Sequence, residues 1–401
     1  MENQDLQEYL EQGVALAGQC KYEEAKAQFE KALKINADSG LAYFHLGCVD
    51  ILQGNTAEGL ENYDKALANG YDDAQIYYNI ALLDESGGDS VSALRNYTKA
   101  IARDPSRPDL RIRKAHLLLE ESQFPEALQL LDETIISDPD VFDGYHLKFT
   151  ALLRLRQFTE AGELLDKAIG MFPGDPGFVF DRVSLFMKQR KTRDALAALA
   201  DLENTEGIDD TVRRRICMER AQVYTAGNDV KAAVRALEAA LPLSDNADGF
   251  DEEIVFLLTN TCLIANEYDK ALAYARRMRE KAVEPYSKKA ARYYEPFALK
   301  MLGRTKESLQ FYEEAIDEFR NMLLVTPRSL DTNLFCAMCL RDIEQFDQAL
   351  EIVDRIIEVQ PETSEAHLLR STIIEARKES EEAAKKKKTS YKMRPEELLK
   401  N

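Results

Sequence analysis

The sequence contains no tryptophan and, in 401 residues, only 12 prolines, 18 glycines, 6 cysteines and 4 histidines. The cysteines are too few and too irregularly spaced for a disulfide framework, which agrees with a reducing compartment. No stretch approaches the roughly 18 uninterrupted apolar residues of a membrane span, and the first residues lack the basic and apolar regions of a signal peptide. We therefore expect a cytoplasmic protein with no membrane segment.

Positive charge is also in deficit. There are 52 lysines and arginines against 71 aspartates and glutamates, which gives a formal net charge of -19. Such a charge repels nucleic-acid phosphates and anionic lipid headgroups at long range, whereas basic partners are steered toward it. This disfavours nucleic acid as a partner. The content of 45% hydrophobic and 31% charged residues is that of a folded, soluble chain.

Motifs for catalysis or cofactor binding are missing as well. The sequence has no glycine-rich phosphate loop, no HExxH and no G-x-S-x-G. Cys336 and Cys339 form a lone C-x-x-C pair on an expected helix, where two buried packing residues are the simpler interpretation. We therefore expect no cofactor, no metal and no catalytic residue. An enzyme with an unrecognised site in residues 203–330, built around Cys262, stays as an alternative.

What the sequence does have is repetition. A small residue recurs every 34 positions, and a larger apolar residue mostly follows four positions later on the same helical face. Small residues let two antiparallel helices approach to about 8–10 Å. A second helix upstream of each small residue carries its own recurring residues, such as Tyr9 with Gly13 and Tyr43 with Gly47. A proline, Pro105, follows the last helix of one repeat and ends it. The recurring small residues are Ala25, Gly59, Ala93, Ala127, Ala161 and Ala195.

This set of positions resembles the tetratricopeptide repeat, or TPR. The resemblance implies an all-α fold, a right-handed α-solenoid (superhelix) of about ten stacked helix hairpins with a C-terminal capping helix. Stacking is required because one hairpin cannot bury both of its apolar faces. The sequence departs from the family pattern at Arg111, where an aromatic residue is usual, at Phe149, where a small residue is usual, and at Gly59, where alanine is usual.

The repeats suggest three parts. Residues 1–202 form a regular array of about six 34-residue repeats. In residues 203–363 the small positions are Ala232, Ala271, Ser308 and Ala349, at longer intervals, which predicts irregular TPR-like repeats. Residues 364–401 form a capping helix and a basic tail of unassigned role. Whether the two arrays make one continuous superhelix or meet at a hinge is left open.

In TPR-like solenoids the first helix of each hairpin lines a concave groove that holds a peptide. By this resemblance, one stripe of the first helices faces the groove, and an apolar stripe left open to water calls for a partner that covers it. The sequence equally allows these side chains to pack against the neighbouring first helices. The predicted groove residues are Phe44, Cys48, Tyr78, Asn79, Leu82, Ile112, Arg113, His116, His146 and Thr150.

These patterns favour a non-enzymatic interaction scaffold or adaptor that binds a peptide or helix of a partner protein. Apolar groove residues would bury the guest, and Asn79, Arg113 and His146 would align it. A peptide-responsive regulator and a self-assembling structural subunit stay as alternatives, and the oligomeric state is open. TPR co-chaperones grip acidic C-terminal peptides with a clamp of Lys, Asn and Arg, but only Asn79 and Arg113 occupy suitable positions here.

Overall fold

The structure, a computed structural model, describes residues 2–243 and 250–392. These residues form α-helices and one short 3-10 helix, Leu241–Leu243, with no strand among them, which confirms the all-α class. None of the helices in this part of the chain is long and apolar enough to cross a membrane. The chain divides into two compact units, Met1–Leu185 and Phe186–Asn401, described separately below.

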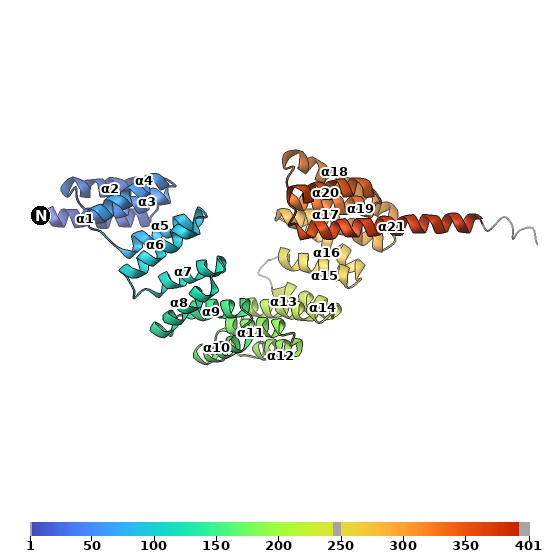
Figure 1. Ribbon diagram of the computed structural model, residues 1–401, viewed down its shortest axis with the longest axis horizontal. Helices are drawn as coiled ribbons and strands as arrows, with labels where there is room; N and C mark the ends of the chain where they lie inside the picture. Colours follow the sequence, from blue (N-terminus) through green and yellow to red (C-terminus); the bar gives the residue numbers. More distant parts are fainter. Residues whose placement is uncertain (1, 244–249, 393–401) are drawn as a thin grey trace, which may run out of the picture. The chain divides into compact units, whose positions relative to one another are not determined.

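Unit 1 is a run of helix hairpins that follow one another in chain order (Figure 1). The hairpins are α1 (Glu2–Gly18) with α2 (Tyr22–Ile35), α3 (Gly40–Leu52) with α4 (Thr56–Ala68), α5 (Ala74–Ser86) with α6 (Ser90–Arg103), α7 (Pro108–Glu120) with α8 (Phe124–Ser137), and α9 (Phe142–Arg154) with α10 (Phe158–Met171). Helix α11 (Pro176–Lys188) contains the boundary between the units. This arrangement confirms the predicted solenoid of stacked hairpins.

The predicted small residues lie where the two helices of a hairpin cross. Ala93 and Ala127 are fully buried. A Cβ atom on Gly47 would lie 2.6 Å from Cδ1 of Tyr63, and one on Gly13 would lie 2.4 Å from Cε1 of Phe29. Only glycine therefore lets the two helices approach this closely beside a large ring.

Each hairpin of unit 1 turns through a residue in the left-handed conformation. Gly54 and Gly88 have φ of +84° and +80°. The residues at the same position of the other hairpins are not glycine: Cys20, Ser122 and Arg156 have φ of +61°, +58° and +59°. This turn recurs at the 34-residue interval although its residue type changes.

Unit 2 continues the pairing of helices with longer elements. It contains α12 (Thr192–Glu203), α13 (Asp210–Ala226), α14 (Val230–Ala240), α15 (Glu252–Ile264), α16 (Tyr268–Lys281), α17 (Pro285–Met301), α18 (Thr305–Val325), α19 (Leu330–Asp342), α20 (Phe346–Val359) and α21 (Ser364–Lys392). Helices α13 and α17 have 17 residues and α18 has 21, whereas α3 to α10 have 13 or 14. These longer helices account for the intervals that end at Ala232, Ser308 and Ala349, whereas the interval from Ala232 to Ala271 is lengthened by the connection 241–251 between α14 and α15.

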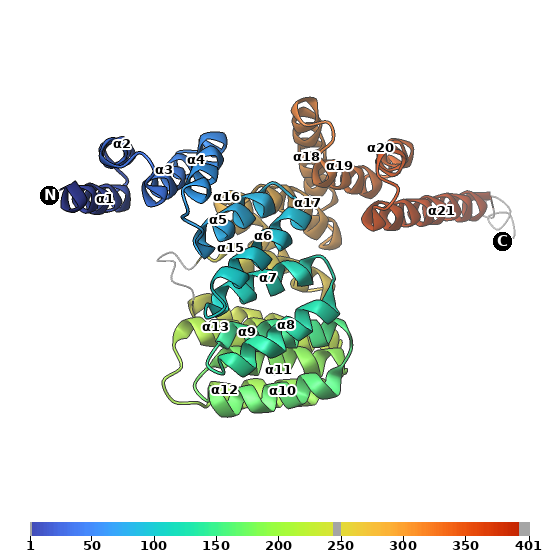
Figure 2. The same ribbon diagram turned by 60° about the vertical axis from the view of Figure 1, so that its left-hand side comes forward.

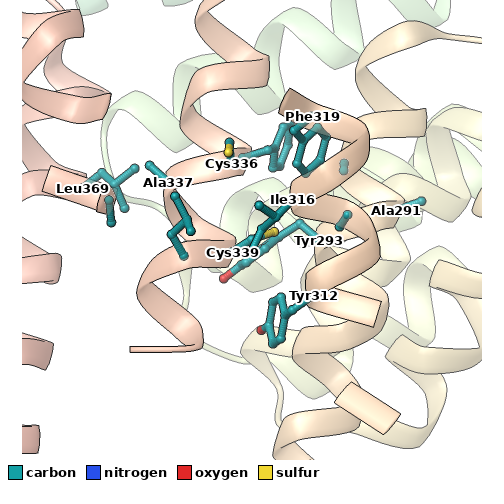
Figure 3. Close-up of a cluster of buried hydrophobic side chains, with 14 of the residues drawn as sticks. Ala291, Tyr293, Tyr312, Ile316, Phe319, Cys336, Ala337, Cys339 and Leu369 are labelled. Atoms are coloured by element: carbon teal, nitrogen blue, oxygen red, sulfur yellow. The ribbon is translucent and has the colours of Figure 1, made fainter. Parts of the chain in front are cut away.

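The core of unit 2 includes a large apolar cluster on α17, α18 and α19 (Figure 3). Its rings include Tyr293, Tyr312 and Phe319. The long helix α21 follows α20 (Figure 2) and covers the cluster with Leu369 and Ile373, as expected of a capping helix. Residues 393–401 of the basic tail lie outside the described part of the chain.

The division at residue 185 differs from the predicted boundary at residue 202. The predicted boundary follows the change of repeat interval, whereas the two compact units reflect the packing of helices. A change of repeat interval at residue 202 and a division of packing at residue 185 can occur in one chain, because the length of a repeat and the packing between helices are separate properties. The three-part division 1–202, 203–363 and 364–401 therefore stays a prediction.

Candidate partner-binding site

Three of the ten predicted groove residues, Cys48, Asn79 and Leu82, line one open pocket in unit 1. The pocket lies between the first helices α3 and α5 and has a volume of about 320 Å³. Close packing between a second helix and the next first helix occurs at α2–α3, α6–α7 and α8–α9, whereas α4 and α5 approach less closely. The pocket therefore opens where α4 and α5 are farther apart than the helices at those three junctions. Its lining is Cys48, Ile51, Leu52, Tyr63, Asn79, Leu82 and Leu83.

Polar atoms meet at the floor of this pocket. The Asn79 side-chain amide donates to the Tyr63 hydroxyl at 2.8 Å, and the Cys48 thiol lies 3.3 Å from the same hydroxyl. Gln75 holds Asn79 in place by donating to its side-chain oxygen at 2.9 Å. Burial raises the pKa of both Tyr63 and Cys48. Both groups therefore stay protonated at neutral pH, and the floor is polar but uncharged.

The walls of the pocket are aliphatic. Leu52, at the end of α3, is 62% exposed, and Ile51, Leu82 and Leu83 are partly buried. An apolar side chain entering here would displace water from these walls at a favourable free energy of roughly 25 cal/mol per Å² of buried apolar area. The pocket therefore suits one apolar side chain over an uncharged polar floor.

The structure corrects the prediction for Phe44. This side chain is only 8% exposed and packs with Tyr63 and Ile76 in the core between the second and third hairpins. Its ring centre lies 5.9 Å from that of Tyr63 and 5.2 Å from that of Tyr71. Because these neighbours already surround it, Phe44 is part of the core and does not face an open groove.

Tyr78 and Ile112 are also engaged with neighbouring elements. The Tyr78 ring is partly buried, 6.0 Å from the Tyr97 ring, and the Arg107 guanidinium lies 5.7 Å above it. Ile112 is partly buried and lies beside Gly144, where its Cδ1 atom would be 3.5 Å from an added Cβ atom. Packing against the next hairpin, the interpretation that the sequence left open, therefore applies to Ile112.

His146 packs against the following helix. Its Nδ1 atom lies 2.5 Å from Oδ2 of Asp181, and its ring stacks on Phe178 with 4.2 Å between centres. The Thr150 hydroxyl is exposed and donates to the His146 carbonyl at 3.0 Å. The imidazole of His146, which was expected to align a bound peptide, therefore already has a partner within the chain, the carboxylate of Asp181.

Arg113 and His116 remain on the surface of α7. Both are exposed, and Nδ1 of His116 lies 3.4 Å from Oε1 of Glu120, one turn later on the same helix. The Arg113 guanidinium lies near the phenol groups of Tyr97 and Tyr78 and the Glu85 carboxylate, which contribute to raising its pKa. The side chains of these two residues are therefore not covered by the next hairpin.

Four lining residues were not among the predicted groove residues. Ile51 belongs to the same helical stripe as Phe44 and Cys48, one turn further along the helix, although it was not among the ten groove residues. Leu52 and Leu83 lie one residue beyond that stripe. Tyr63 was expected only as a packing residue of the second helix. It fills that role, but its hydroxyl also reaches the pocket floor.

The cysteines of unit 2 are buried. Cys262 is fully buried in the cluster formed by α13 to α17, and burial raises the pKa of its thiol to about 12. Cys336 and Cys339 point into the apolar cluster of α17 to α19 (Figure 3), and burial raises the pKa of Cys336 to about 11. A protonated, buried thiol is a poor nucleophile or metal ligand. In residues 2–243 and 250–392 no three His, Cys, Asp or Glu side chains are grouped to hold a metal ion.

Comparison with known proteins gives a consistent family. Family models described as tetratricopeptide repeat match residues 7–39, 52–108, 86–148 and 303–373. No curated protein matches. Among solved structures, a tetratricopeptide repeat protein from Parabacteroides merdae is 18% identical, with 64% of this chain and 99% of that chain covered and a TM-score of 0.45.

Two further solved structures are similar at the level of fold. YrrB, a TPR protein with an unusual peptide-binding site, is 22% identical, with 43% of this chain and 90% of that chain covered and a TM-score of 0.37. A chain of the Naa15/Naa10 complex bound to HypK-THB is 15% identical, with 95% and 67% covered and a TM-score of 0.40. With its stacked hairpins, its buried small residues at the crossings and these family matches, the chain belongs to the tetratricopeptide repeat family.

Proposed function

We propose that this protein is a non-enzymatic scaffold that binds a peptide or helix of a partner protein through the pocket between α3 and α5. The observation that carries the proposal is an open, apolar-walled pocket between the first helices of consecutive hairpins. Its volume of about 320 Å³ is near the lower end of the range for ligand pockets, about 300–1,000 Å³. The pocket therefore accepts one large side chain of the partner rather than a whole ligand.

Binding would rest on one apolar anchor. Burying a leucine or phenylalanine side chain contributes about 1.5–3 kcal/mol, and anchors of this kind dominate the energy of most interfaces. The Asn79 amide and Tyr63 hydroxyl hold each other in place, so the floor is formed before the partner arrives. Exposed Arg113 and His116, on α7, the first helix that follows α5, supply polar contacts for the rest of the partner segment.

A tryptophan reporter tests this function directly. Because the chain has no tryptophan, Leu52→Trp places a unique fluorophore at the mouth of the pocket. Peptides lacking tryptophan would be selected from a random library on the wild-type protein and titrated into this variant. We expect a saturable change in tryptophan emission, because a peptide side chain entering the pocket excludes water from the indole.

Two matched substitutions make the test specific. Leu82→Asp, in the pocket wall, is expected to weaken the selected peptides at least tenfold, because an unpaired charge would be desolvated. Ile136→Asp changes an 80% exposed residue of α8 outside the pocket lining and should leave affinity within twofold. Circular dichroism checks that both variants are helical. Equal affinity of wild type and Leu82→Asp would place the binding site elsewhere.

A further inference from the structure

Ion pairs join consecutive hairpins at a repeating position. Asp132 of α8 pairs with Lys148 of α9, and 34 residues later Asp166 of α10 pairs with Arg182 of α11. In unit 2, Oδ1 of Asp354 on α20 lies 2.6 Å from Nε of Arg370 on α21, with the same separation of 16 residues. In each case a carboxylate on a second helix meets a cation on the following first helix.

This pair is broken one hairpin earlier. Lys114 of α7 occupies the cation position, 34 residues before Lys148, but Thr98 of α6 replaces the aspartate. The Thr98 hydroxyl donates to the Leu94 carbonyl of its own helix at 2.7 Å. Among the residues that the structure describes, Lys114 has no ion-pair partner within 4 Å. The cation has therefore kept its place while its carboxylate is missing.

The surroundings of Lys114 leave its charge poorly compensated. The side chain is partly buried, and this burial lowers the pKa of its ammonium group, which the more distant Glu133 offsets only in part. The Glu133 carboxylate also accepts a hydrogen bond from Gln129 of its own helix at 3.0 Å. A partly buried cation without a close carboxylate is a costly arrangement that an added anion would relieve.

A pocket of about 450 Å³ lies between α6 and α8, and both Thr98 and Lys114 line it. Leu94, Leu118 and Leu130 provide apolar lining, and the other charged lining groups are Arg95, Glu126 and Glu133. The pocket is separate from the one between α3 and α5, with which it shares no residue. The lining of this pocket therefore combines the Lys114 cation with apolar side chains, at the position where the following hairpins carry an aspartate.

We propose that this pocket binds an aspartate or glutamate side chain of a partner protein. The partner's carboxylate would take the place of the aspartate carboxylate that is missing in this hairpin, where Thr98 stands at the aspartate position. Lys114 donates to the carboxylate in a charge-assisted hydrogen bond, and the leucines cover the methylene groups and an adjacent apolar residue. At the same position of the following hairpins, the group that pairs with the cation is a protein carboxylate, that of Asp132 or Asp166. Glu126 and Glu133 repel groups of higher negative charge, so the site selects a single carboxylate over a phosphate.

The test uses NMR of lysine side chains labelled with ¹³C in the full chain. The probes are hexanoate, hexyl phosphate, and N-acetylated, C-amidated tripeptides Leu-Glu-Leu and Leu-Gln-Leu. We expect hexanoate and Leu-Glu-Leu to shift the Lys114 signal saturably and to raise the pKa of Lys114. Leu-Gln-Leu should bind at least tenfold more weakly, because it lacks the charge, and hexyl phosphate should bind more weakly than hexanoate.

Substitutions provide an independent arm. Thr98→Asp restores the internal carboxylate, so it should raise the melting temperature and weaken Leu-Glu-Leu at least tenfold, which a misfolded variant could not do. Lys114→Met should also abolish binding, which in this variant is followed by the line broadening of the peptide's own NMR signals because the Lys114 signal is absent. Lys148→Met, in which the replaced lysine is already paired with Asp132, should leave affinity within twofold.

Several results would overturn the proposal. Unchanged Leu-Glu-Leu affinity in Thr98→Asp, or equal affinity for Leu-Gln-Leu, would show that no carboxylate occupies the missing position. Binding of hexanoate without binding of the tripeptide would exclude a protein side chain as the ligand. Tighter binding of hexyl phosphate than of hexanoate would contradict selection for a single carboxylate.

Discussion

The ammonium nitrogen of Lys99 lies 5.4 Å from the centre of the Tyr77 ring, within the range of a cation–π contact. The same two positions hold Lys31 with Tyr9 at 5.5 Å, Lys65 with Tyr43 at 5.9 Å and Lys167 with Tyr145 at 5.7 Å. This contact joins the second helix of a hairpin to the first at the 34-residue interval. The recurring tyrosine of the first helix therefore contacts a lysine of the second helix in addition to its role in packing.

The fourth hairpin changes both members of this pair. Arg111 replaces the tyrosine and Glu133 replaces the lysine. The Arg111 guanidinium donates instead to the Ser137 hydroxyl at 3.1 Å and to the Pro105 carbonyl. The departure at Arg111 that the sequence revealed is therefore accompanied by a second change on the partner helix, and the fold is kept.

Restoring both residues should restore the contact. We expect Arg111→Tyr combined with Glu133→Lys to be more stable than the sum of the single substitutions by about 0.5–1 kcal/mol, the usual size of an exposed cation–π contact. Urea unfolding followed by circular dichroism at 222 nm measures the four proteins of this cycle. Additive free energies would mean that the contact contributes nothing in this hairpin.

A second prediction concerns the left-handed turns. Arg156 has φ of +59°, which costs a residue with a side chain about 1–2 kcal/mol relative to its right-handed conformation. Arg156→Gly should therefore raise the free energy of unfolding by about 0.5–1 kcal/mol, since part of the gain is offset by the greater entropy of glycine in the unfolded chain.

Gly54, at the same position of the second hairpin with φ of +84°, provides the converse change. Gly54→Ala should lower the free energy of unfolding by about 1 kcal/mol, although no neighbouring atom would touch the added methyl group. Thermal melts of both variants test the pair. A loss of stability in Arg156→Gly would show that the arginine side chain contributes more than the strain of its backbone.

A third prediction concerns the crossing of α3 and α4. Gly47→Ala would place a methyl group 2.6 Å from the Tyr63 ring and 2.9 Å from the Gly59 carbonyl oxygen, so the two helices must separate. We expect a loss of about 1–3 kcal/mol, the usual cost of overpacking. Because Tyr63 also forms the pocket floor, this variant should bind the selected peptides more weakly.

Gly18, at the end of α1, is the matched control. A Cβ atom there meets no atom within 4 Å, and its φ is not in the left-handed region. Gly18→Ala should therefore leave stability unchanged or raise it slightly, since alanine has the higher helix propensity. If both alanine variants lose equal stability, close contact with Tyr63 is not the cause at Gly47.

The sequence predicted the features that each hairpin determines for itself. Ala93 and Ala127 were identifiable because two crossing helices require a small side chain wherever they meet. The left-handed turn was not identifiable, because Cys20, Ser122 and Arg156 occupy it in place of glycine and side chains of these types carry no such signal.

For the candidate groove residues the limit of the sequence has a different reason. These residues lie on the first helices α3, α5, α7 and α9, but whether each side chain is open to a partner depends on the next hairpin. Asp181, which pairs with His146, lies 35 residues further along the chain. Phe44 is covered by Tyr63 and Tyr71, which follow it in the sequence by a helix and a turn. Helical periodicity within one helix contains no information about these contacts.

The fourth prediction concerns alkaline pH and the buried phenols of unit 2. Burial raises the pKa of Tyr294 and of Tyr274 from 10 to about 12 each. A folded-state pKa above the unfolded value means that the folded protein holds the proton more tightly. The resulting stability is fully present below about pH 10 and is lost as the pH rises toward 12. Each tyrosine can contribute a slope of at most about 1.4 kcal/mol per pH unit in this window.

Tyr294→Phe removes one of these protons while keeping the ring that packs 6.2 Å from Phe256 and 5.8 Å from Tyr293. The Tyr294 hydroxyl makes no hydrogen bond among the described residues that this substitution would remove. Its pKa is raised mainly by burial, with a smaller effect of Tyr286. Urea unfolding at pH 9, 10 and 11 should show a shallower decline for this variant than for the wild type, with equal stability at pH 8. Parallel declines would mean that the Tyr294 hydroxyl already reaches water in the folded protein, since only a desolvated phenol resists ionisation in this window.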